Sequence, residues 1–102
     1  MGEKDVLDIK EINKDLVFAQ LRNLIDPLFL SKETLQHIEQ YFPFDRIQKE
    51  ASQGTISRND ISDFVIAFAR ALREDVKAAG RTVIETNDID VAFTKVKARS
   101  PF

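Results

Sequence analysis

The chain has 102 residues, the length of a single domain and too few for two independent cores. Hydrophobic residues make up 43% of it and its formal net charge is −2, so it can build a core, but its overall field does not attract nucleic acid. The absence of cysteine excludes disulfides, thiolate zinc sites and cysteine nucleophiles.

Two helices are predicted in the N-terminal part of the chain. Apolar residues recur at helical spacing from Glu11 to Ile25, and Asp26-Pro27 should end that helix. Ser31 is expected to cap a short second helix that reaches Phe42. Residues 1–42 are therefore interpreted as a helical extension of a core formed by residues 43–102, within a single folding unit. The apolar residues of this extension that need cover are Leu16, Leu21, Leu24, Leu28, Phe29 and Leu30.

Three further helices are predicted after the extension. Pro43 suits the first position of a third helix, which stops in a polar loop. Ser57, with Asp60 three residues later, forms a capping-box variant that begins the longest helix, and Gly80 supplies its left-handed stop. A short β-prone run follows, and then Thr86 is expected to cap the last helix.

The longest helix is predicted to be buried on several sides. At about 100° per residue, the residues from Phe64 to Ala67 point around its whole circumference. A strip of three helices cannot cover such a helix by itself, so a second copy of the chain is expected to complete the core. The predicted dimer core consists of Ile61, Phe64, Val65, Phe68 and Leu72.

The order of short, long and short helices resembles the histone fold. PFDRIQKEASQGTIS (43–57) is similar to the first helix and first loop of archaeal-type histones, and GRTVIETNDIDVA (80–92) to their second loop and third helix. The resemblance implies an all-α histone fold with two additional N-terminal helices, in which the first loop of one chain lies beside the second loop of the other. A homodimer or homotetramer is therefore expected, with Val83-Ile84 pairing with Thr55-Ile56 of the partner subunit.

By the same resemblance, Arg81 and Asp88 form an ion pair within one chain that braces the second loop. The alternative is an exposed arginine beside an aspartate at a helix start, a pair worth only about 0–1 kcal/mol.

The histone resemblance implies a function in DNA architecture. A prokaryotic protein of this type, in the cytoplasm and associated with the nucleoid, would bind double-stranded DNA through phosphates without sequence specificity and bend or bridge it. The expected DNA contacts are Arg46, Lys49, Arg58, Arg81, Thr82, Lys95, Lys97 and Arg99. The alternative interpretation of these residues is an ordinary solvated face. The chain also departs from the family: Thr55 stands where an arginine often enters the minor groove, and Glu85 replaces a lysine.

A second resemblance points to a different class of protein. Residues 57–96 are also similar to the helical lid of AAA+ ATPases, which has a comparably short helix ahead of a Gly-Arg pair. The sequence contains no phosphate-binding G-x-x-x-x-G-K-[ST] loop, so the chain alone is not expected to hydrolyse ATP. A lid-like module without that loop would be an adaptor for other proteins and could be a monomer, whereas a histone is an obligate dimer.

No enzymatic role is expected. His37 is the one histidine and lies four residues from Glu33 on a predicted helix, where a lone histidine is far more often a surface or half-buried residue than a general base. Asp88 and Asp90 point in roughly opposite directions on a helix, which makes them a poor metal clamp. We therefore expect no cofactor, no metal, no small-molecule substrate and no membrane partner.

Overall fold

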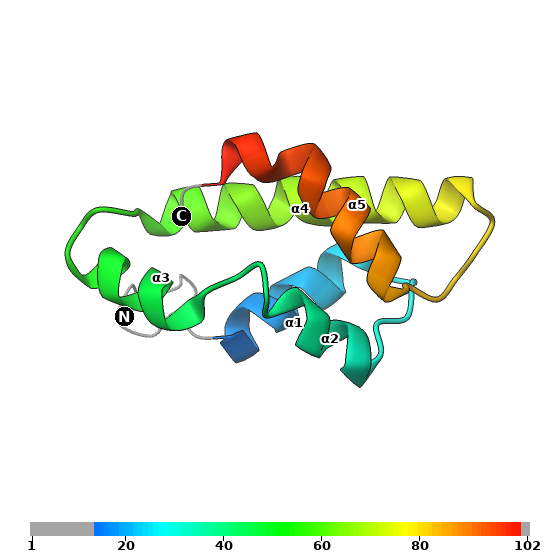
Figure 1. Cartoon of the computed structure of the whole chain (residues 1–102), viewed down its shortest axis with the longest axis horizontal. Helices are drawn as coiled ribbons and strands as arrows, with labels where there is room; N and C mark the ends of the chain where they lie inside the picture. Colours follow the sequence, from blue (N-terminus) through cyan, green and yellow to red (C-terminus); the bar gives the residue numbers. More distant parts are fainter. Residues whose placement is uncertain (1–13, 101–102) are drawn as a thin grey trace.

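The computed structural model describes residues 14–100, apart from the side chains of Lys14 and Arg58. This part of the chain is helical and contains no strand, so the all-α prediction is confirmed (Figure 1). The elements are α1 (Lys14–Ile25), α2 (Lys32–Ile38), α3 (Phe44–Ser52), α4 (Arg58–Ala78), α5 (Thr86–Val96) and the 3₁₀ helix η3 (Lys97–Arg99). The predicted helix start at Glu11 lies outside the described residues. In the described part, no helix is both long and apolar enough to cross a membrane.

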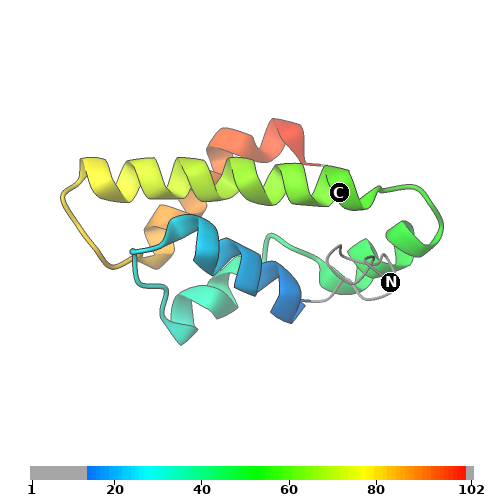
Figure 2. The same ribbon diagram turned by 180° about the vertical axis from the view of Figure 1, so that it is seen from behind.

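Helix α4 runs along the length of the molecule, and two other helices pack against it. Helix α5 crosses one side of α4, and α1 lies against a different side (Figures 1 and 2). The Gln20 side chain of α1 donates a hydrogen bond of 3.1 Å to the Ser62 hydroxyl of α4. The N-terminal extension is thus packed on the central helix itself.

The ends of α4 follow the sequence prediction. The Ser57 hydroxyl accepts from the Asp60 amide at 3.0 Å, and the Ser57 amide donates to the Asp60 carboxylate at 3.3 Å, which completes the capping box. At the other end Gly80 has φ of 72°, a conformation that a side chain disfavours. The amides of Gly80 and Arg81 donate back to the carbonyls of Lys77 and Val76, which closes the last turn.

Three helix boundaries differ from the prediction. Helix α2 does begin after Ser31 but ends at Ile38 rather than Phe42, and residues 39–41 form turns. Pro43 itself, with ψ of 83°, is the N-cap of α3 rather than its first residue. The N-cap of α5 is Glu85 rather than Thr86, because the Asp88 carboxylate accepts from the Glu85 amide at 2.7 Å.

Most apolar residues of α4 are buried by the chain to which they belong, whereas Ile66 and Ala67 are half-buried. Phe64, Val65 and Phe68 are at most 1% exposed within one copy. The five residues predicted as a dimer core are all buried in this way: Ile61, Phe64, Val65, Phe68 and Leu72. The reasoning that one copy cannot cover these residues is therefore wrong, because it counted only the three helices of residues 43–102.

Residues on both sides of position 42 build that core. Helix α1 contributes Val17, Leu21 and Ile25, each at most 2% exposed. The ring of Phe42, which follows α2, lies 5.6 Å from Phe64 and 5.7 Å from Phe68 between ring centroids. The N-terminal residues therefore fill the side of α4 for which a second copy was expected.

The second loop is also paired within the chain. Phe29 and Val83 form an isolated parallel bridge, in which the Phe29 amide donates to Thr82 at 2.9 Å and the Ile84 amide donates to Phe29 at 3.0 Å. Within one chain, the second loop thus pairs with the segment between α1 and α2, and the expected pairing of Val83-Ile84 with Thr55-Ile56 of the partner subunit stays a prediction.

Candidate functional site

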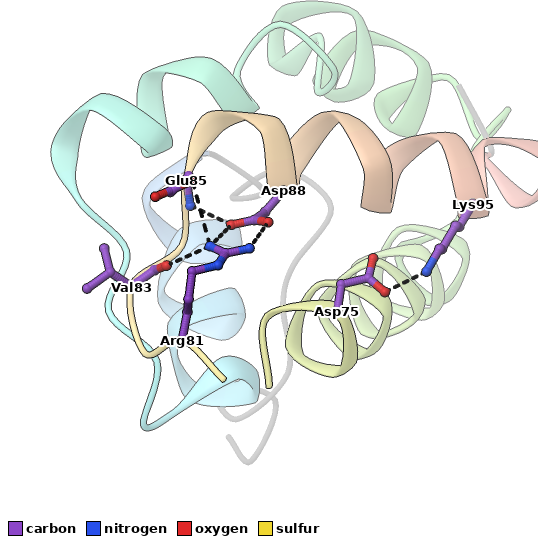
Figure 3. Close-up of polar contacts among 6 residues, drawn as sticks. All are labelled: Asp75, Arg81, Val83, Glu85, Asp88 and Lys95. Carbon is purple, nitrogen blue, oxygen red and sulfur yellow. Dashed lines mark hydrogen bonds and ion pairs between the residues drawn. The ribbon is translucent and has the colours of Figure 1, made fainter. Parts of the chain in front are cut away.

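A polar cluster lies at the second loop, where Arg81 meets Asp88 (Figure 3). The two guanidinium nitrogens of Arg81 donate to the two carboxylate oxygens of Asp88 at 2.8 and 2.7 Å, a bidentate pair. Arg81 also donates to the Val83 carbonyl at 3.3 Å, and Asp88 accepts from the Glu85 amide. Asp88 is only 6% exposed, so this pair is more than the exposed contact considered as the alternative. It ties the loop to the first turn of α5.

The electrostatics of this cluster follow from the pair. The hydrogen bonds from Arg81 hold the pKa of Asp88 below its ordinary value; burial opposes this shift, and the Glu85 amide adds to it. Asp88 in turn raises the pKa of the Arg81 guanidinium. Arg81 therefore braces the second loop, with its charge compensated by Asp88 and three of its five N–H donors engaged.

The lowered pKa of Asp88 predicts an acid-sensitive contribution to stability. This contribution is present above the unfolded-state pKa of about 3.9 and is lost as the pH falls through the lower folded-state pKa. Asp88→Asn should lose roughly 2 kcal/mol of unfolding free energy at neutral pH and then fall less steeply in acid. Urea unfolding of both proteins from neutral pH down to about pH 2 measures this. Coincident pH profiles of the two proteins would show that the pair contributes nothing to stability.

The other residues predicted to contact DNA do not form one surface. Arg46 pairs with Glu50 at 2.7 Å on α3, and Lys95 pairs with Asp75 at 2.5 Å between α5 and α4 (Figure 3). Lys49, Thr82, Lys97 and Arg99 are exposed, and the side chain of Arg58 is outside the described part of the structure. Helix α3 and the second loop lie at opposite ends of α4, which spans about 30 Å (Figure 1). A single chain therefore does not bring the two loops together.

A second polar cluster joins α2 to α5. His37 Nε2 lies 2.7 Å from an Asp90 carboxylate oxygen that also accepts from the Tyr41 hydroxyl. These hydrogen bonds, that of Tyr41 before that of His37, lower the pKa of Asp90, and Asp90 raises the pKa of Tyr41. The Tyr41 ring stacks on Phe93 at 4.3 Å between centroids. His37 is therefore paired with Asp90 of α5 rather than with Glu33 of its own helix, and this contact links α2 to α5.

The structure also contains a groove between α1 and α4 that the sequence analysis missed. Leu24 of α1 lines it together with residues from the second half of α4: Ile66, Ala69, Arg70, Arg73, Glu74 and Lys77. The available indication was the spacing of Arg70, Arg73 and Lys77, three and four residues apart, which puts three cations on one helix face. Treating α4 as apolar on every side obscured it.

Comparisons with known proteins do not assign the chain to a family. No family model, no curated protein and no solved structure matches it. Within residues 14–100, no group of three or more His, Cys, Asp or Glu side chains is arranged to hold a metal ion. Function is therefore inferred from the geometry of the clusters and the groove.

Proposed function

We propose that the chain is a protein–protein interaction module that acts as a single copy, similar in plan to the helical lid of AAA+ ATPases. One observation carries the proposal: the N-terminal part of the chain makes, within one copy, the two contacts for which the histone resemblance implies a second copy. Helix α1 covers α4, and Phe29 pairs with Val83 of the second loop. A chain that completes its own core in this way has no need of the second copy that a histone requires.

The distribution of charge favours a protein partner over DNA. Non-specific DNA affinity depends on several phosphates being neutralised at once. Arg46, Arg81 and Lys95 are each engaged by a carboxylate of the chain. The two loops that a histone dimer brings together on DNA lie about 30 Å apart in one copy. The DNA-binding architecture expected from the histone resemblance thus lacks its geometric basis in a single chain.

Exposed apolar side chains support a protein partner. Phe29 is 59% exposed and Val83 47%, and the bridge holds them side by side. Clustered apolar side chains on the surface of a small domain often mark sites of protein contact. A lid-like module supplies such surfaces without chemistry of its own.

An electrophoretic shift assay tests the proposal against the DNA alternative. With random-sequence duplex, we expect no complex at protein concentrations of about 1–10 μM and physiological salt. The double variant Arg46→Ala, Arg81→Ala should behave like the wild type at every salt concentration. A salt-sensitive complex that weakens in the double variant would favour the histone-like function and contradict the proposal.

A further inference from the structure

The groove between α1 and α4 has an apolar floor. Leu24 lies near the end of α1, and Ile66 and Ala69 belong to α4. Leu24 and Ile66 are half-buried, whereas Ala69 is only 1% exposed. These side chains are contributed by two helices packed together (Figure 2). The floor therefore exists only in the folded chain and presents apolar surface that a ligand can cover.

The rim of the groove is positively charged and unneutralised. Arg70, Arg73 and Lys77 are exposed, and within the described residues none of their side chains makes a hydrogen bond or ion pair. Glu74 is the one acid that lines the groove with them, which leaves a formal charge of +2 from three cations and one acid. By contrast, Lys95 of α5, which packs on another side of α4, forms an ion pair with Asp75.

Like-charge and opposite-charge pairs are balanced along this face of α4. Arg70 with Arg73, and Arg73 with Lys77, are like-charge pairs three or four residues apart, and Glu74 forms opposite-charge pairs of the same spacing with Arg70 and Lys77. A ligand with negative charges on the rim would therefore pair with the cations that are in excess.

We infer that this groove binds an acidic amphipathic helix of a partner protein, an inference that rests on the proposed function. Arg70 and Lys77 are two turns apart, about 10 Å, which matches carboxylates spaced three and four residues apart on a helix. The apolar floor distinguishes this partner from nucleic acid, because a phosphate backbone needs cations but no apolar surface. The ligand covers the floor with aliphatic side chains and pairs its acids with the rim.

The test measures binding of a synthetic helical peptide by fluorescence anisotropy. The peptide has about 15 residues, with glutamates three and four residues apart beside a stripe of leucines, and a control peptide carries glutamine at each glutamate. The full-length protein is compared with the double variant Arg70→Glu, Lys77→Glu, and with Lys49→Glu, a single charge reversal at an exposed position of α3 outside the groove. Thermal unfolding monitors that all three proteins remain folded.

The groove variant should bind the acidic peptide at least roughly tenfold more weakly and lose most of its salt dependence, whereas Lys49→Glu should stay within about twofold of wild type. The glutamine peptide should bind the wild type weakly. Equal affinity of wild type and groove variant would place peptide binding elsewhere, which overturns this inference and leaves the proposed function standing. No peptide binding also overturns the inference. If duplex DNA is shifted as well, the proposed function fails with it.

Discussion

Removal of residues 1–41 is expected to leave the rest of the chain without a folded monomeric state. The buried apolar side chains lost from the described part would be Val17, Phe18, Leu21, Ile25, Leu28, Leu30 and Ile38. At about 1.5–3 kcal/mol each, their burial contributes on the order of 10–20 kcal/mol. A domain of this size is stable by only about 5–15 kcal/mol, so the fragment should unfold or aggregate.

Circular dichroism and light scattering on the fragment 42–102 measure this directly. A chain lacking only residues 1–13 is the matched control, since it keeps all seven of these side chains, and it should retain helix content and cooperative unfolding. A fragment 42–102 that forms a well-folded dimer would contradict the account, because its three helices would then complete their core as histones do.

Leu21→Ala should be among the most damaging single substitutions in the chain. Leu21 lies in α1 and is 1% exposed, and truncation of a buried leucine costs about 2–5 kcal/mol. Leu16, five residues earlier on the same helix, is 37% exposed, so Leu16→Ala should cost less than about 1 kcal/mol. The two substitutions remove the same atoms and differ only in whether the leucine is buried.

Urea unfolding of both variants at neutral pH separates the two interpretations of α1. If α1 were a loosely attached extension, Leu21→Ala would unfold at nearly the same urea concentration as Leu16→Ala. In the fold described above, the midpoint of Leu21→Ala falls well below that of Leu16→Ala, because a cavity opens between α1 and α4.

Local features of the fold were predictable because they depend on neighbouring residues. Only a few residues of context determine the capping box of Ser57 and Asp60, the N-cap at Ser31 and the left-handed conformation of Gly80. The partner of α4 was not predictable in this way. An apolar helix is covered equally well by its own chain or by a second copy, and periodicity alone does not distinguish them.

The same limit applies to the functional surfaces. Arg81 and Asp88 are seven residues apart, so their pair could be anticipated, whereas His37 meets Asp90 across 53 positions. The cations of the groove are visible in the sequence of α4, but its floor requires Leu24 from another helix. The spacing of Arg70, Arg73 and Lys77 predicts a charged face, and only the fold makes it a groove.

Sedimentation equilibrium over a dilution series down to nanomolar protein tests the central claim, that one copy completes its own core. The account predicts a single species of 11.7 kDa at every concentration, with undiminished helix content. A species of twice that mass that persists on dilution, or that loses its helices as it dissociates, would contradict it.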